Sequence, residues 1–197
     1  MPDDARHRGQ RVLSGLRGTG RRPLCSVGAV PAISSHDPAV FVAPLRYQLE
    51  AFLDAHRDAL YHCLDDVTEE EARRQLVPSK TTLLGLVKHA AFVELVWFNE
   101  AITGHSRAEI GCPDGPDESF NLEPRDTIQT VRATYRDVCE ASRATAATLG
   151  VDDVVHGNRR GPLPMRWVYL HMLRELSQHC GHADILREQI LAARQPA

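Results

Sequence analysis

Side chains of the kind that bind metals recur at helical spacing near the C-terminus of the sequence. His171, Glu175 and His179 follow at intervals of four residues, and His182 comes three residues later. Four residues are about one helical turn, so these side chains share nearly one helix face. Imidazole and carboxylate both bind divalent metals, and a metal ion would compensate for their burial. The alternative is a partly solvated face with an arginine partner such as Arg174.

A further histidine lies in a strongly apolar segment, residues 81–97. His89 falls on the same helix face as Leu86, so it is expected within the buried stripe. A core histidine satisfied by one hydrogen bond is the ordinary interpretation of such a residue. Together with Glu175 and His179, however, His89 gives a set of three ligands with an open fourth position. That arrangement is typical of catalytic zinc rather than structural zinc.

Three other residues are candidates for the site, and the sequence supports them less strongly. His182 is a candidate for supporting a ligand or shuttling a proton. His56 lies in the apolar stripe of an earlier helix, where it either faces the metal cavity or is a hydrogen-bonded core histidine. Cys180 follows His179 directly and therefore points about 100° away from the ligand face, as a packing residue would.

Apolar residues at helical spacing predict four long helices, which would position these side chains. They are expected over residues 44–64, 81–103, 124–149 and 165–193. Thr68 followed by Glu71 has the pattern of a capping box, which predicts a short connecting helix. The connection over residues 104–121 is long enough to cover one end of the bundle as a lid. Gly181 inside the last helix suggests a close helix contact or a ligand near the backbone. The stripe expected for the first helix consists of Leu45, Leu49, Phe52, His56, Leu60 and Cys63.

Two blocks of the sequence carry a resemblance to a known family. Residues 45–191 resemble the DinB-like superfamily of four-helix metalloproteins, and most closely the branch that includes the actinobacterial mini-circle protein. The matching stretches are residues 77–79, 83–89, 94 and 97–98, and in the last helix residues 166–168, 171–172, 175, 179, 181–184 and 186–188.

The resemblance implies an all-α, up-down-down-up four-helix bundle with one metal ion between its helices. The usual ligands of the family are three histidines, but this sequence has Glu175 where one of them is expected. His, Glu and His is the ligand set of the mycothiol-dependent maleylpyruvate isomerase branch, so the implied ligands here are His89, Glu175 and His179. That isomerase has a separate C-terminal domain, whereas this sequence stops at Ala197, so the resemblance does not extend to the isomerase reaction itself.

The expected function is transfer of a small thiol to an electrophile at a divalent metal. Zinc is the first choice of metal, with nickel and iron as alternatives, and it would lower the pKa of a bound thiol or water. The resemblance implies mycothiol as the thiol, or bacillithiol in some other bacteria. Metal-assisted hydrolysis would use the same site. A non-enzymatic metal-binding or stress-response bundle is the other alternative, and a closed coordination sphere would favour it.

Composition and charge limit the binding partners and the cellular setting that the sequence allows. The net charge of −3 gives no case for nucleic acid or an anionic membrane as a partner, and no apolar run approaches the length of a membrane span. Residues 1–43 are basic and lack a persistent apolar period, so they are expected to be a disordered extension of a domain at 44–194. The oligomeric state stays open, a homodimer included. An odd number of irregularly spaced cysteines favours a reduced, cytoplasmic setting: Cys25, Cys63, Cys112, Cys139 and Cys180.

Overall fold

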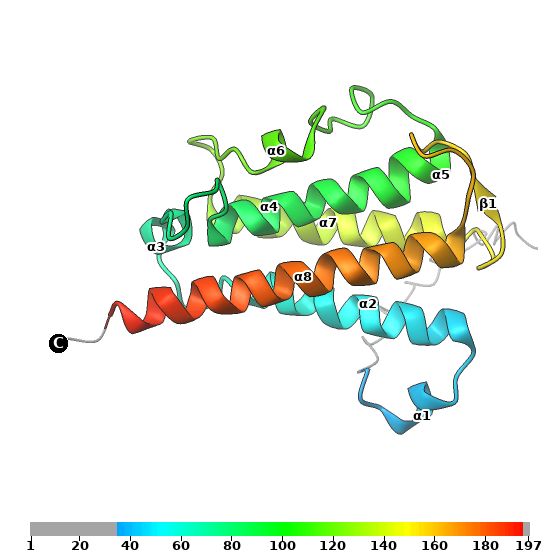
Figure 1. Cartoon of the computed structure of the whole chain (residues 1–197), viewed down its shortest axis with the longest axis horizontal. Coiled ribbons are helices and arrows are strands. Elements are labelled where there is room, and N and C mark those ends of the chain that lie inside the picture. Colours follow the sequence, from blue (N-terminus) through cyan, green and yellow to red (C-terminus); the bar gives the residue numbers. More distant parts are fainter. Residues whose placement is uncertain (1–34, 195–197) are drawn as a thin grey trace, which may run out of the picture. The chain divides into compact units, whose positions relative to one another are not determined.

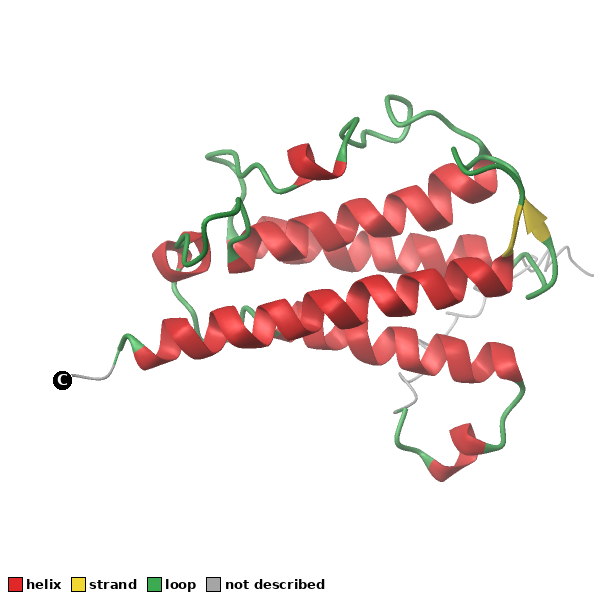
Figure 2. Cartoon of the chain, in the orientation of Figure 1, coloured by secondary structure: helices red, strands yellow, loops and turns green. Residues whose placement is uncertain are grey.

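Four long helices form an antiparallel bundle in a computed structural model of the protein, which describes residues 35–194 (Figures 1 and 2). Helices α2 and α8 run in one direction, and α4 and α7 run in the other (Figure 1). The all-α, up-down-down-up bundle expected from the sequence is therefore confirmed. The long elements are α2 (Leu45–His62), α4 (Leu83–Glu94) continued by the π-helix η1 (Leu95–Glu100) and by α5 (Ala101–Thr103), α7 (Ile128–Ala146) and α8 (Met165–Ala192).

Short elements connect the long helices. Thr68 and Glu71 form the predicted capping box at the start of α3. Residues 154–164, between the third and fourth expected helices, contain a small antiparallel pair in which Val154 lies opposite Pro164. The short elements are α1 (Pro38–Phe41), α3 (Glu69–Arg73), α6 (Pro116–Ser119), β1 (Val154–Val155) and β2 (Leu163–Pro164).

Helix boundaries agree with the sequence pattern except at α7 and within the second long helix. Helix α7 begins at Ile128 rather than at Pro124, because Thr127 caps it by accepting a hydrogen bond from the backbone N–H of Thr130. The second helix, expected to be regular over residues 81–103, widens into a π-helix at Leu95–Glu100. Hydrophobic periodicity does not reveal such widening, which is frequent near functional sites.

The buried face of α2 differs from the predicted stripe. Leu49 and Leu60 are buried as expected, but Leu45 and Phe52 are 55% and 46% exposed. Arg57 is buried instead, because its guanidinium reaches the bundle interior. The apolar pattern alone could not identify a charged residue as part of the buried face.

Helix α4 is buried on nearly every side. It packs against α7 and α8, and the connection carrying α6 covers the side that the long helices leave open (Figure 1). That connection has to be long, because α4 and α7 run in the same direction and the chain returns along the whole bundle between them. A helix covered in this way has to be mostly apolar around its circumference, as residues 83–93 are apart from Lys88 and His89.

One buried ion pair joins α2 to α4. The guanidinium of Arg57 donates two hydrogen bonds to Glu94, from Nε to Oε1 at 2.8 Å and from Nη2 to Oε2 at 2.7 Å. Burial lowers the pKa of Arg57, but the adjacent carboxylate outweighs that effect and raises it overall. Both side chains are almost completely buried, so water cannot replace either partner, although Arg57 also donates to the partly exposed Asp54 at 2.9 Å.

Other arginines satisfy carbonyl groups at helix ends. Arg46 donates to the carbonyl of Ala146 at the end of α7 at 2.9 Å. Arg187 on α8 donates to the carbonyl of Cys63 just after α2 at 3.0 Å. The last carbonyls of a helix have no partner within the helix, so these contacts both satisfy them and join neighbouring helices.

The predicted extension over residues 1–43 lies mostly outside the described residues. The part that is described includes α1, where Val40 is buried. Within residues 35–194, the helices are too short or too polar to cross a membrane.

The Arg57–Glu94 pair generates a stability prediction. Replacing Glu94→Gln should lower the free energy of unfolding by about 3 kcal/mol, because it removes the buried carboxylate that pairs with Arg57 and leaves that guanidinium only the partly exposed Asp54. Urea unfolding followed by circular dichroism measures the loss. The matched control is Glu123→Gln, which removes an exposed ion pair with Arg125 and should cost less than about 1 kcal/mol. Equal losses in the two variants would contradict the assigned role of the pair.

Candidate functional site

Two of the three predicted ligands meet between α4 and α8. The rings of His89 and His179 lie edge to face with 4.8 Å between their centroids. Both residues are buried, with 6% and 9% of their surface exposed. The sequence placed them on apolar faces of separate helices, and the packing of α4 against α8 brings these faces together.

The hydrogen bonds of His89 define which of its nitrogens is free. Its Nδ1 lies 2.6 Å from Oγ of Ser119, and that hydroxyl donates its own proton to the carbonyl of Pro116. Ser119 therefore accepts, so Nδ1 of His89 carries the proton and Nε2 keeps a lone pair. Phe120 stacks on the imidazole with 4.0 Å between ring centroids. This pairing is the support that a metal-binding histidine normally receives.

His179 is the one predicted ligand whose polar atoms have no partner. Both of its ring nitrogens are buried and make no hydrogen bond. Leaving a buried donor and a buried acceptor unsatisfied costs free energy, about 1–3 kcal/mol for each group. A metal ion bound to one nitrogen would compensate for part of this cost, so the histidine fits the metal site expected from the sequence.

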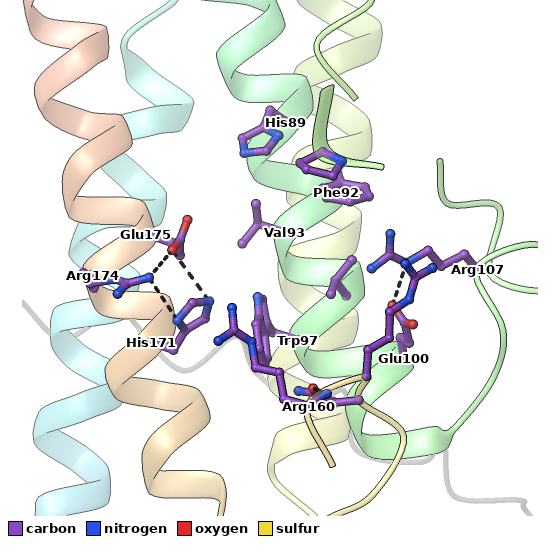
Figure 3. Close-up of a pocket in the computed structure, with 14 residues that line it drawn as sticks. His89, Phe92, Val93, Trp97, Glu100, Arg107, Arg160, His171, Arg174 and Glu175 are labelled. Atoms are coloured by element: carbon purple, nitrogen blue, oxygen red, sulfur yellow. Dashed lines mark hydrogen bonds and ion pairs between the residues drawn. The ribbon is translucent and has the colours of Figure 1, made fainter. Parts of the chain in front are cut away.

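Glu175 points its carboxylate at neighbours on its own helix. Its Oε1 accepts a hydrogen bond from Nη2 of Arg174 at 2.7 Å and lies 3.6 Å from Nε2 of His171 (Figure 3). Burial raises its pKa, but Arg174 and His171 outweigh that effect and lower it overall. The side chain is therefore an anion at neutral pH.

The donor types fit a divalent metal, although the arrangement is not a preformed metal site. Within residues 35–194, no three His, Cys, Asp or Glu side chains are grouped so as to hold a metal ion. Two neutral imidazoles lie together, while Glu175 is engaged with Arg174. Coordination by all three predicted ligands would require the Glu175 carboxylate to turn away from that arginine.

Burial keeps the imidazoles of the site neutral. It lowers the pKa of His89 to about 4, and the neighbouring His179 adds to the effect. Burial also lowers the pKa values of His179 and His171. Neutral imidazole is the form that binds metals, so these groups are ready to act as ligands near pH 7.

A cavity of about 330 Å³ adjoins His89 and Glu175. It lies between α4, η1 and α8 and is bordered by the connection around α6 and by the hairpin tip between β1 and β2 (Figure 3). The connection runs along α4 rather than over one end of the bundle, and its residues Arg107 and Pro116 line the cavity. The cavity is lined by His89, Phe92, Val93, Val96, Trp97, Glu100, Arg107, Pro116, Asn158, Arg159, Arg160, His171, Arg174 and Glu175.

Aromatic rings support the wall of the cavity opposite His89. The ring centroid of Trp97 on η1 lies 4.2 Å from that of His171 on α8. Trp167 stacks on the same histidine, with 4.9 Å between the ring centroids. The π-helix takes part in this wall, because Val96, Trp97 and Glu100 all belong to it. The cavity therefore has an apolar middle and charged groups at its edges.

The weaker candidates from the sequence lie elsewhere. His56 is half-buried and donates from Nδ1 to the carbonyl of Phe52 in its own helix at 2.7 Å. His182 is exposed, with 6.3 Å between its ring centroid and that of His179. Neither lines the cavity. The close contact suggested by Gly181 is wrong, because nothing lies within 4 Å of where its Cβ would be. Cys180 is a packing residue, as expected.

Sequence reasoning missed several residues that shape the site. Ser119 and Phe120 lie in the long connection, and only the return of the chain along α4 places them on His89. Trp97 lies eight residues after His89, a spacing that keeps it near the same helix face and that hinted at a role in the site. Arg160 lies between glycines in a short segment without any periodic signal.

Comparison with known proteins gives one match. Residues 48–192 match the model of a family described as mycothiol-S-transferase. The matched range starts within α2 and ends with α8, so it includes every residue that lines the cavity. The family lies in the DinB-like superfamily, and the resemblance seen in the sequence is therefore confirmed. No curated protein shows a significant match to this chain.

The protein's own cysteines are poor nucleophiles within the described residues. Burial raises the pKa of Cys112 and Cys180 to about 11 and that of Cys63 and Cys139 to about 12. The thiolate is the nucleophilic form of cysteine, so these residues are almost entirely unreactive thiols at neutral pH. Among residues 35–194, no cysteine lines the cavity.

These pKa values predict slow alkylation of the four described cysteines in the folded protein. A thiol with a pKa of about 11 is ionised to only about one part in three thousand at pH 7.5, and its reaction should accelerate as the pH rises toward 11. Iodoacetamide labelling followed by peptide mass spectrometry measures each site separately. The same protein unfolded in urea is the control and should react far faster. A cysteine that reacts equally fast in both states would contradict the prediction.

Proposed function

Because this chain belongs to the mycothiol-S-transferase family, we propose that it transfers a mycothiol-type thiol to a small electrophile in the cavity beside His89. In this proposal, His89, Glu175 and His179 hold a divalent metal, zinc in the first instance. The observation that carries the proposal is the imidazole of His179, which is buried against His89 with both nitrogens unpartnered.

The protein residues around this pair prepare it for metal binding. Ser119 accepts the Nδ1 proton of His89 and so keeps the Nε2 lone pair available. Phe120 covers the same ring and limits the access of water to it. When bound, a divalent metal would supply the positive charge that keeps a thiol ionised near neutral pH.

Glu175 and its neighbours adjust the charge at the edge of the cavity. An anionic carboxylate lowers the net charge of the ligand set by one relative to three imidazoles. A divalent ion with this ligand set and a bound thiolate would have no net charge, which is easier to hold in a partly apolar pocket than a charged site. Arg174 helps to keep this carboxylate ionised through a hydrogen bond of 2.7 Å, which Glu175 would exchange for the metal. Val93 and Trp97 offer an apolar surface against which the carbon skeleton of an electrophile can pack.

The ligand assignment predicts which histidine variants lose metal. His179→Ala should abolish stoichiometric metal binding while the bundle stays helical, because apolar burial supplies most of its stability. Its control is His182→Ala on the same helix, which should keep full metal content. Ser119→Ala should weaken metal affinity by about 10–100-fold through the lost support of His89. Elemental analysis and competition with a chelator measure these effects, and full metal in His179→Ala would refute the assignment.

The proposed reaction predicts metal-dependent conjugation of mycothiol. The metal-loaded protein should accelerate the disappearance of thiol in the presence of monochlorobimane, and His179→Ala should lose at least about tenfold in kcat/KM, corresponding to about 1.4 kcal/mol. Product fluorescence measures the rate, with the chelated protein as a control. Absence of thiol-dependent product over a broad panel of electrophiles would reject transferase activity. Hydrolysis without thiol would favour the hydrolase instead.

A further inference from the structure

The tip of the β1–β2 hairpin is fixed rigidly against the end of the second long helix. The backbone N–H of Gly157 donates to the carbonyl of Ala101 at 3.0 Å. A Cβ at position 157 would lie 2.1 Å from the carbonyl oxygen of Glu100, so only glycine permits this approach. The residues that follow Gly157 are therefore held at the edge of the cavity by a backbone contact.

Arg160 extends from this tip over the aromatic wall. Its guanidinium carbon lies 5.9 Å from the ring centroid of Trp97 and 5.8 Å from that of Trp167. Figure 3 shows the side chain beside Trp97, at the end of the cavity opposite His89. No carboxylate in residues 35–194 forms an ion pair with Arg160, so its charge remains available to a ligand.

Asn158 adds a buried donor at the same place. Its Oδ1 accepts the backbone N–H of Arg160 at 2.6 Å, and this bond determines the orientation of the amide. The Nδ2 group is consequently turned the other way, where it is buried and has no acceptor. An unsatisfied buried donor is costly, and an oxygen atom of a bound ligand would remove that cost.

The arginines around the cavity are not all neutralised, and the excess positive charge lies near the hairpin tip. Two of its four arginines are neutralised locally, since Arg107 pairs with Glu100 at 2.9 Å and Arg174 pairs with Glu175 at 2.7 Å. The two arginines of the hairpin tip, at positions 159 and 160, have no such carboxylate within the described part of the chain. The excess positive charge therefore lies at the tip, away from the predicted metal ligands.

We propose that Asn158 and Arg160 form a carboxylate-binding subsite, and that the electrophile used by this protein carries a carboxylate. This inference rests on the proposed thiol transfer and specifies its substrate class. The Arg160 guanidinium and the Asn158 amide N–H, two residues apart at the hairpin tip, both line the cavity and are donors suited to the oxygens of a carboxylate. The cavity volume of about 330 Å³ lies at the low end for ligand pockets, which suits a small carbon skeleton.

The arrangement also orients such a substrate. With its carboxylate at the hairpin tip, the carbon skeleton lies along the apolar middle of the cavity, against Trp97 and Val93. The opposite end of the molecule then points toward His89 and Glu175, where the thiol is proposed to react. The tip binds and orients the substrate, and it takes no part in the chemical step.

Direct binding tests the subsite independently of turnover. The only two tryptophans of the chain, Trp97 and Trp167, both lie under Arg160, so their fluorescence reports a ligand at this position. Benzoate should quench it with a lower Kd than benzamide does. Arg160→Gln should weaken benzoate binding about fivefold, and Asn158→Asp should weaken it further by placing a like charge at the donor position. The control is Arg125→Gln, an exposed arginine outside the cavity, which should leave the Kd unchanged.

Turnover identifies which co-substrate carries the carboxylate. With mycothiol as the thiol, 4-chloro-3-nitrobenzoate is compared with its methyl ester. Arg160→Gln should lower the ratio of kcat/KM for the acid to that for the ester about fivefold, with no rise in the KM for mycothiol. An unchanged ratio, or a rise only in the KM for mycothiol, would overturn the proposal.

The binding experiment and the turnover experiment together distinguish failure of the subsite from failure of the proposed function. Arg160-dependent binding of benzoate without any thiol transfer would support the subsite and reject the transferase function. Thiol transfer with equal use of acid and ester, and with equal binding of benzoate and benzamide, would support the function and reject the subsite. Inorganic phosphate competing better than benzoate would also reject the assignment to a carboxylate.

Discussion

Helix α4 is enclosed on nearly every side, with only Lys88 partly exposed, so its buried polar groups have to find partners inside the protein. Glu94 meets Arg57 from α2 in a bidentate ion pair. His89 donates to Ser119, which the long connection brings back over the helix. Because α4 and α7 run in parallel, that connection spans the bundle, and the same constraint therefore encloses the helix and supplies the partner of its histidine.

The candidate site follows from what this enclosure leaves unsatisfied. His179 faces His89 from α8 but finds no hydrogen-bond partner, and Asn158 leaves a buried amide without an acceptor at the far end of the cavity. In a well-packed interior, unpartnered polar groups are rare and often mark places where a ligand completes the structure. One of these groups suits a metal ion and the other suits an anionic oxygen, so the two ends of the cavity have different chemical preferences.

The π-helix joins these two ends. Glu94 closes the regular helix with its side chain in the bundle interior, and the wider turns that follow put Trp97 and Glu100 on the cavity wall. Trp97 packs against His171 and lies under Arg160, so one aromatic ring contacts both the helix with the proposed ligands and the hairpin tip. Local widening at this point is consistent with the frequent occurrence of π-helices at functional sites.

The sequence by itself determined the four helices, because their apolar stripes recur over many turns, and it determined that His89 and His179 belong to buried faces. The tertiary structure decided what those faces meet. Periodicity carries no information about a buried arginine such as Arg57, about a π-turn, or about which loop residue lies on a helix. Ser119 and Arg160 act through contacts between segments distant in the sequence, and only the packed chain brings such segments within hydrogen-bonding or stacking distance.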